Sequence, residues 1–250
     1  MDSLESKTVL LADDDPLITS LYQTKFKKLG LQYDITVLDD GSSDRTVTVA
    51  QALAADYPLV LIRHPKNLGL GETMRDGLEA VAAKSAVDDL IVTMDCDDTH
   101  DPQYMGAAFE KVREGFDMVI LSRYQQGGGE KGLSAVKSTL SRGAGLFLKV
   151  LFPIRGVKEY SCGYRVMKAS ALQKALKVFG KDFVRLPHMG CVVTPEILIK
   201  FRMLGLRIGE VPFVLRYDQK PGVSKNRPLK TIAGYFALVA NFWGRKAPQA

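Results

Sequence analysis

Short apolar runs alternate with amphipathic stretches through the first two-thirds of the chain, and no other feature constrains the fold as strongly. Strands are expected at 8–12, 34–38, 59–63, 90–94 and 118–121, and helices at 17–29, 45–54, 72–83 and 103–114. Strands that alternate with helices of this length build βαβ units. The sequence therefore predicts an α/β fold in which helices flank a mostly parallel sheet.

Three polar or glycine-rich loops each follow one of the expected strands. Their sequences are DDGSSD at 39–44, HPKNLGLG at 64–71 and DCDDTH at 95–100. In an open α/β sheet, ligands bind outside the carboxyl ends of the strands. We therefore expect these loops to meet at one edge of the sheet and to carry the functional residues.

The third loop begins with two carboxylates, Asp95 and Asp97, separated by one residue. Two such groups at a strand tip suit a hard divalent cation that keeps several waters and holds phosphate oxygens, so the pair predicts a metal–diphosphate site. The alternative is a solvated acidic turn before a helix, with Thr99 or Asp101 as N-cap and Pro102 at the first helical position.

The charge of the chain favours an anionic partner. Its 250 residues include 34 basic and 28 acidic side chains, a net charge of +6. Basic residues gather between 123 and 165 and between 216 and 227. Because no recognised nucleic-acid motif accompanies them, we expect no nucleic acid, and phosphates or an anionic membrane surface fit better.

Cysteine usage and hydropathy indicate the compartment. Cys96, Cys162 and Cys191 form no CxxC pair, so neither a zinc site nor a disulfide framework is indicated and a reducing, cytoplasmic environment is expected. No signal pattern opens the chain, and no apolar run approaches the roughly 20 residues that span a bilayer. We expect a soluble or peripheral protein at the cytoplasmic membrane face, with a separate membrane-anchoring subunit left open.

The C-terminal segment favours membrane contact. Residues 231–243 carry no charge, contain four aromatic side chains and are flanked by Lys230, Arg245 and Lys246, a pattern suited to an amphipathic helix at an interface, although an ordinary buried helix has a similar composition. We divide the chain into a catalytic part at 1–215 and a basic loop with this helix at 216–250, both within one domain. The glycine-rich residues 127–129 are expected to form a mobile loop that closes over a ligand.

Together these motifs resemble family 2 glycosyltransferases of the GT-A (Rossmann-like) fold, and most closely the dolichol-phosphate or polyprenyl-phosphate mannosyltransferase branch. The matching segments are DDGSSDRT at 39–46, NLGLGETMRDGL at 67–78, DCDDTHDP at 95–102, SRYQQGGG at 122–129, YSCGYRVM at 160–167 and PGVSK at 221–225. The resemblance implies a donor such as GDP-mannose or UDP-glucose, a metal that is Mg²⁺ or Mn²⁺, and a polyprenyl phosphate acceptor.

The resemblance also assigns roles by position. It places Asp39, Asp40, Asn67, Gly69, Arg75, Asp95 and Lys225 against the nucleotide sugar, and Asp95 and Asp97 on the metal. Arg123, Lys137, Ser141 and Arg165 face the acceptor phosphate, Gly163 lines the acceptor side, and Asp97 and Arg123 are catalytic. A lipid phosphate is already an anion and needs no general base, so in-line attack with inversion is expected.

Three departures from the family pattern stand out. Residues 11–16 are LADDDP, where the family has a Pro-x-Tyr-Asn-Glu-like segment; Glu159 replaces an Asp, and Gln219 replaces an Arg. Two alternatives stay within GT-A enzymes: a transferase with a soluble or protein acceptor, and a nucleotidyltransferase. A third, a receiver-like phospho-switch, is suggested by residues 9–30, but no Asp ends the run at 59–63.

Overall fold

A seven-stranded sheet forms the centre of the structure, a computed structural model that describes residues 7–12, 34–43, 45–55, 58–95, 97–219 and 228–248. The strand order is β3-β2-β1-β4-β7-β5-β8, and a second sheet pairs β6 with β9. The bounds are β1 Lys7–Ala12, β2 Asp34–Asp39, β3 Leu59–Arg63, β4 Leu90–Asp95, β5 Met118–Ser122, β6 Gly129–Lys131, β7 Arg165–Lys168, β8 Ile208–Pro212 and β9 Val214–Arg216.

The central sheet is mostly parallel, as the sequence predicts. All its neighbouring strands run parallel except β7, which lies between β4 and β5 and is antiparallel to both. Residues 90–94 of β4 and all of β5 are buried, because strands covered on both faces need near-continuous apolar sequence.

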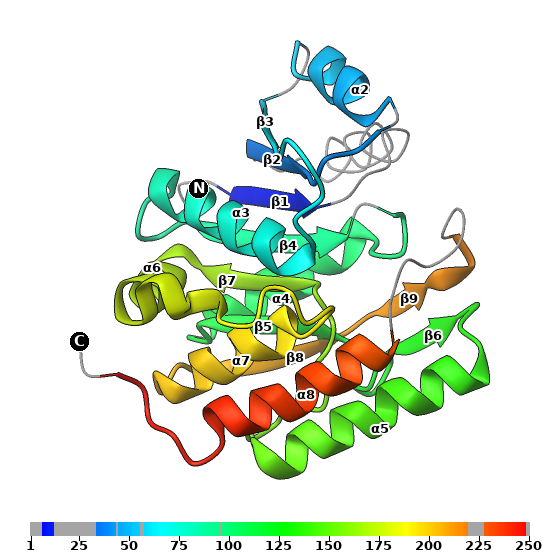
Figure 1. Cartoon of the computed structure of the whole chain (residues 1–250), viewed down its shortest axis with the longest axis vertical. Helices are drawn as coiled ribbons and strands as arrows, with labels where there is room; N and C mark the ends of the chain where they lie inside the picture. The colour runs from blue at the N-terminus through cyan, green and yellow to red at the C-terminus, as the bar shows by residue number, and fades with distance from the viewer. Residues whose placement is uncertain are drawn as a thin grey trace.

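Helices cover the sheet (Figure 1). Their bounds are α2 Thr46–Leu53, α3 Leu70–Lys84, α4 Met105–Arg113, α5 Ala135–Leu151, α6 Ala169–Phe179, α7 Val193–Met203 and α8 Pro228–Phe242, with 3-10 turns at η1 Pro102–Tyr104, η2 Gly180–Val184 and η3 Tyr217–Gln219. The helices expected at 45–54, 72–83 and 103–114 correspond to α2, α3 and η1 with α4, whereas the one expected at 17–29 lies outside the described residues.

The glycine-rich segment is a loop at 127–128 that leads into a strand, and its expected mobility stays a prediction. Gly129 begins β6, which pairs with β9, and its backbone N–H donates to the carbonyl of Phe213 over 3.1 Å. A Cβ on Gly128 would lie 2.5 Å from the carbonyl oxygen of Ser122. The glycine therefore permits close packing of this segment on the end of β5.

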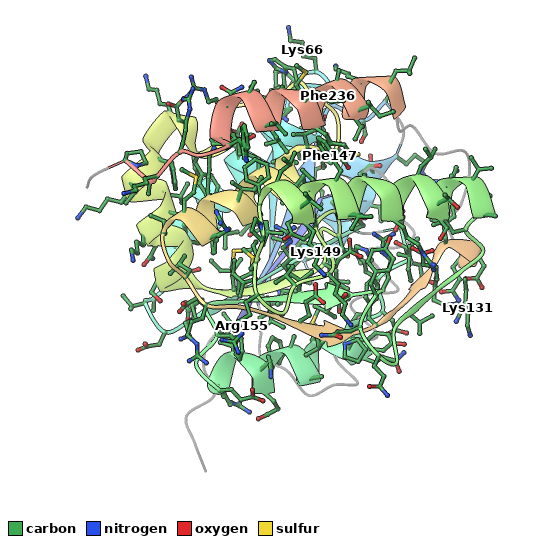
Figure 2. All side chains as sticks on the ribbon, turned by 90° about the horizontal axis from the view of Figure 1, so that it is seen from below. Lys66, Lys131, Phe147, Lys149, Arg155 and Phe236 are labelled. Carbon is green, nitrogen blue, oxygen red and sulfur yellow. The ribbon has the colours of Figure 1, made fainter. Side chains whose placement is uncertain are left out.

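Helices α5 and α8 lie side by side at one end of the molecule (Figure 1). The rings of Phe147 and Phe236 meet between them with centroids 5.7 Å apart (Figure 2). Leu148, Leu238 and Phe242 are buried beneath them, so α8 packs on the same core as the sheet. Among the described residues, no helix combines the length and hydropathy that a membrane crossing requires.

Candidate functional site

The carboxyl ends of β2 and β4 lie at one edge of the sheet, on either side of β1. Ala12 of β1 pairs with Leu38 on one side and with Asp95 on the other. Since neighbouring strands are about 4.8 Å apart, the tips of β2 and β4 lie about 10 Å apart. The strand order reverses at β1, which is where α/β sheets bind ligands. The structure thus brings the 39–44 and 95–100 loops to one edge, as expected.

Asp95 and Asp97 have different environments at the tip of β4. The side chain of Asp95 is 55% exposed, whereas Asp97 is buried and its Oδ1 accepts hydrogen bonds from Oγ1 and the backbone N–H of Thr99, at 2.5 and 3.3 Å. Asp98, which lies between Asp97 and Thr99, has φ 58°, a left-handed conformation that Asp tolerates better than most residues. This turn separates the strand from η1.

The alternative assignment of this segment is also partly correct. Asp101 caps η1, its Oδ1 accepting from the backbone N–H of Gln103 at 3.1 Å, with Pro102 at the first position. One short segment therefore supplies both a strand-tip carboxylate pair and a helix start.

His100 holds the Asp95 backbone, a role that the sequence did not reveal. Its Nδ1 accepts a hydrogen bond from the Asp95 N–H at 3.0 Å, so the ring proton of the neutral tautomer lies on Nε2, which faces Oδ2 of Asp95 at 3.8 Å. The buried ring stacks on Tyr164 with centroids 4.9 Å apart. In the sequence, only the short spacing from Asp95 indicates a role for His100. Its stacking partner Tyr164 is 64 residues away and could not be identified from the sequence.

The first and second loops are joined by Asp40. Its Oδ1 accepts from the backbone N–H of Leu68 and from Nδ1 of His64, and its Oδ2 accepts from the N–H of Gly69, each at 2.8 Å. Gly41 has φ 71°, and a Cβ there would lie 2.4 Å from the backbone of Lys66. The carboxylate of Asp40 thus shapes the 64–71 loop; its predicted contact with the nucleoside stays a prediction.

The Asp40–His64 pair shifts the pKa of both partners. Burial raises the pKa of Asp40, but the hydrogen bonds from His64, Leu68 and Gly69 outweigh it and lower the pKa below 3.8. Burial lowers the pKa of His64, but its hydrogen bonds with Asp40 and Asp76 outweigh it and raise the pKa above 6.5. Both shifts favour a charged pair.

Asp39 is fully buried at the tip of β2. Its Oδ1 accepts from the N–H of Ser42 at 3.1 Å, and its Oδ2 lies 3.4 Å from Nε of Arg63. Within the described part of the chain, Oδ2 accepts no hydrogen bond. An acceptor of this kind suits an N–H donor such as one on a nucleobase.

The remaining predicted nucleotide residues lie at the start of α3. Gly69 is the N-cap residue, Asn67 is exposed, and Arg75 is partly buried on the first turns. The guanidinium of Arg75 already pairs with Glu72 and with Asp76, to which its Nε donates at 3.1 Å. Lys225 lies outside the described residues.

Arg123 lies at the end of β5 in a cluster of polar groups. It forms a bidentate ion pair with Glu159 at 2.7 and 2.9 Å, and its Nη1 donates to Glu130 at 3.1 Å. Its Nη2 also donates to Oγ of Ser141 at 3.3 Å and of Ser161 at 3.1 Å. The structure therefore brings Arg123 and Ser141 together, as predicted. It also places the guanidinium of Arg123 between the carboxylates of Glu130 and Glu159.

The 159–165 segment connects this cluster with the tip of β4. Ser161 contacts Arg123, and Gly163 lies against Asp95, whose Oδ1 would be 3.6 Å from a Cβ on that glycine. The carbonyl of Gly163 accepts from Oγ1 of Thr93 at 2.7 Å. This segment thus connects the residues predicted for the donor side with those predicted for the acceptor side.

Arg165 does not have the predicted role. Its guanidinium is buried and donates to the carbonyl oxygens of Cys162, Thr194 and Tyr160 at 3.0, 2.8 and 3.2 Å. Burial lowers the pKa of Arg165 to about 10. These bonds use three of its five N–H donors and hold the segment in place, and burial of the guanidinium argues against a phosphate contact.

Lys137 lies one turn before Ser141 on α5. Its Nζ donates to the hydroxyl of Tyr217 at 3.3 Å and lies 5.1 Å from the centroid of that ring. It is exposed. The prediction that it binds the acceptor phosphate is untested.

The residues at the tip of β4 fit a hard divalent cation. Such a cation takes oxygen ligands and completes its shell with water and substrate phosphate, so two carboxylates are a sufficient protein contribution. The exposed carboxylate of Asp95 and the buried one of Asp97 would supply the oxygens. Among the described residues, no group of three or more His, Cys, Asp or Glu side chains forms a closed metal cage.

Comparison with known proteins identifies the family. Residues 16–184 match the family described as Glycosyl transferase family 2. The chain belongs to this family. A dolichol-phosphate mannosyltransferase from Pyrococcus furiosus is 32% identical over 207 residues, which are 82% of this chain and 54% of that protein. A polyprenol monophosphomannose synthase from Mycolicibacterium smegmatis is 28% identical over 196 residues, 78% of this chain and 70% of that protein.

The chain thus spans about half the length of the Pyrococcus relative. Membership of this family argues against the receiver-like alternative.

Solved structures confirm the GT-A fold. A glucosyl-3-phosphoglycerate synthase from Mycobacterium tuberculosis, in complex with Mn²⁺, UDP and glucosyl-3-phosphoglycerate, superposes with a TM-score of 0.59 at 20% identity, over 94% of this chain and 77% of that one. A mannosyltransferase from Pyrobaculum calidifontis in complex with GDP-Man and Mn²⁺ gives a TM-score of 0.58 at 15% identity, over 97% of this chain and 65% of that one.

Proposed function

We propose that this family 2 glycosyltransferase moves a hexose, mannose or glucose, from a nucleoside diphosphate to a polyprenyl phosphate with inversion. The names of the two curated relatives support this acceptor class. The observation that carries the proposal is the position of Ser141, which contacts Arg123 from a helix whose outer face is apolar.

That outer face suits an amphiphilic acceptor. On α5, Val136, Leu140, Leu146 and Val150 are between 56% and 70% exposed. On α8, Leu229, Ile232 and Phe236 are between 44% and 83% exposed, and Trp243, which follows the helix, is 64% exposed. A peripheral helix pair of this kind buries apolar side chains at the headgroup boundary of a bilayer. The phosphate of the acceptor then lies at Ser141 while its isoprenoid chain stays in the membrane.

The residues of the site divide the reaction between them. Asp39 and the 64–71 loop bind the nucleoside, and Asp95 and Asp97 hold Mg²⁺ or Mn²⁺. Bound there, the cation supplies positive charge that neutralises the departing diphosphate. Nη1 of Arg123 carries two N–H groups, of which Glu130 accepts one, and the other binds the acceptor phosphate and orients it for in-line attack.

Turnover assays test this function. We expect transfer from GDP-mannose or UDP-glucose with Mn²⁺ only when polyprenyl phosphate is supplied in detergent or liposomes, and a β-linked product from an α-linked donor. Transfer to a soluble acceptor without lipid would establish the alternative instead. Replacing Leu146 and Phe236 by Ser is expected to lower turnover on liposomes but not donor binding.

A further inference from the structure

A basic pocket of about 480 Å³ lies beside the acceptor side of the site, between α5 and the loop that follows β5. Four cationic side chains line it: Arg123, Arg142, Lys149 and Lys158. No Asp or Glu is among the described residues that line it. The proposed reaction uses only Arg123 of these four.

Three of the four cations form no ion pair with the described residues. Arg123 is compensated by Glu159 and Glu130. Arg142 instead lies over the ring of Tyr124, 5.8 Å from its centroid, and Lys158 donates to Oε1 of Gln125 at 3.1 Å. In the part of the chain that the structure describes, neither they nor Lys149 forms an ion pair. Like charges around one pocket repel, so a bound anion stabilises the arrangement.

The pocket opens onto the apolar outer face of α5. Leu146 lines it and is 64% exposed, and Val150 follows one turn later with 70% exposed. Figure 2 shows Lys149 on the side of α5 away from α8, while Phe147 faces Phe236 of α8. A ligand that enters here therefore meets cations within the pocket and apolar side chains at its rim. An anionic lipid headgroup has this combination, whereas a soluble phosphate makes no use of the rim.

We propose that this pocket binds the phosphate of an anionic membrane phospholipid and thereby orients the α5–α8 face on the bilayer. This phospholipid is not the acceptor, whose phosphate lies at Ser141 on the inner side of the helix. The inference goes beyond the transfer reaction and rests on the membrane contact in the proposed function. Arg142, Lys149 and Lys158 would then act as a headgroup clamp, with Leu146 in the acyl boundary.

Vesicle flotation tests the inference without any turnover. The R142Q/K149Q/K158Q variant is compared with K84Q/K174Q/K177Q, which removes the same charge from exposed positions on α3 and α6. Vesicles contain phosphatidylcholine alone or with phosphatidylglycerol. Because each basic residue at an anionic surface contributes about fivefold to binding, the pocket variant, which lacks three, is expected to lose on the order of 100-fold for the anionic vesicles and little for the neutral ones. The control is expected to change only several-fold.

The remaining outcomes overturn the inference. Equal losses in both variants would indicate general charge attraction. Loss of calorimetric binding of inorganic phosphate with unchanged binding to anionic vesicles would make the pocket a site for soluble phosphate. If wild-type protein binds neutral and anionic vesicles equally, this inference alone is wrong. If it binds no vesicle, the proposed membrane contact is wrong as well. Thermal melting of each variant checks the fold.

Discussion

Arg123 and Glu159 form a bidentate ion pair, with Nε 2.7 Å from Oε2 and Nη2 2.9 Å from Oε1. The same carboxylate accepts hydrogen bonds from the backbone N–H groups of Ser161 and Cys162. Burial raises the pKa of Glu159, but Arg123 and these donors outweigh it and lower the pKa. The pair thus fixes the segment that continues to Gly163, beside Asp95.

Substitution of Glu159 is expected to destabilise the protein in a graded way. Glu159→Gln leaves the guanidinium of Arg123 buried with half its compensation, and removing one partner of a buried pair costs about 3–5 kcal/mol. Glu159→Asp keeps the charge but shortens the side chain, so a smaller loss is expected. Urea unfolding measures both. Equal stability of Glu159→Gln and wild type would show that Glu130 alone compensates Arg123.

The carboxylates at the tip of β4 are expected to separate binding from stability. Because the side chain of Asp95 is exposed, Asp95→Asn should change the free energy of unfolding by no more than about 0.5 kcal/mol. The same substitution should abolish Mn²⁺-dependent binding of the donor. Asp97→Asn weakens the bonds from Thr99 and should cost about 1 kcal/mol as well. Calorimetry with GDP-mannose and UDP-glucose measures binding.

Asp88→Asn, an exposed carboxylate just before the other end of β4, is the matched control. It is expected to leave donor binding and stability unchanged. Metal-dependent binding that survives in Asp95→Asn would contradict the proposed metal site.

The charged Asp40–His64 pair predicts a pH window for stability. The pKa of His64 is raised from 6.5, so its contribution is complete below pH 6.5 and is lost as pH rises through the raised value. The pKa of Asp40 is lowered from 3.8, so its contribution is complete above pH 3.8 and is lost as pH falls through the lowered value. The pair stabilises most between these limits.

Thermal melting of wild type and His64→Asn measures this window. We expect the difference in Tm to be largest near pH 5 to 6 and to shrink at alkaline pH. Each kcal/mol corresponds to about 2–4 °C for a chain of this size. A difference that is constant from pH 5 to 9 would mean that folding does not shift the pKa of His64.

The fold and the position of the loops at one edge of the sheet follow from the sequence because both depend on local pattern. Periodicity located the strands, and the rule that loops meet at the carboxyl edge placed Asp39 and Asp95 correctly. What failed depends on distant partners. In the sequence Arg165 resembles a surface cation, because its partner Thr194 is 29 residues away. Arg123 and its partner Glu159 are likewise 36 residues apart. The antiparallel β7 likewise has no local mark, since strand direction is set by its neighbours.

Gly41 is expected to be the least replaceable glycine at the site. Its Cβ would lie 2.4 Å from the carbonyl carbon of Lys66 and 2.6 Å from the nitrogen of Asn67, and its φ is 71°. Gly41→Ala therefore combines left-handed strain with a backbone clash, and a loss of about 2–4 kcal/mol is expected.

Two other glycines separate strain from clash. Gly156 has φ 81° with nothing within 4 Å of its Cβ position, so Gly156→Ala carries the strain alone, about 1–2 kcal/mol. Gly106 lies in α4 without either problem, and Gly106→Ala should be neutral or stabilise by up to about 1 kcal/mol. Urea unfolding ranks the three. Because Gly41 holds the 64–71 loop against Asp40, Gly41→Ala alone is also expected to weaken donor binding; equal donor affinity in all three variants would separate this loop from the nucleotide site.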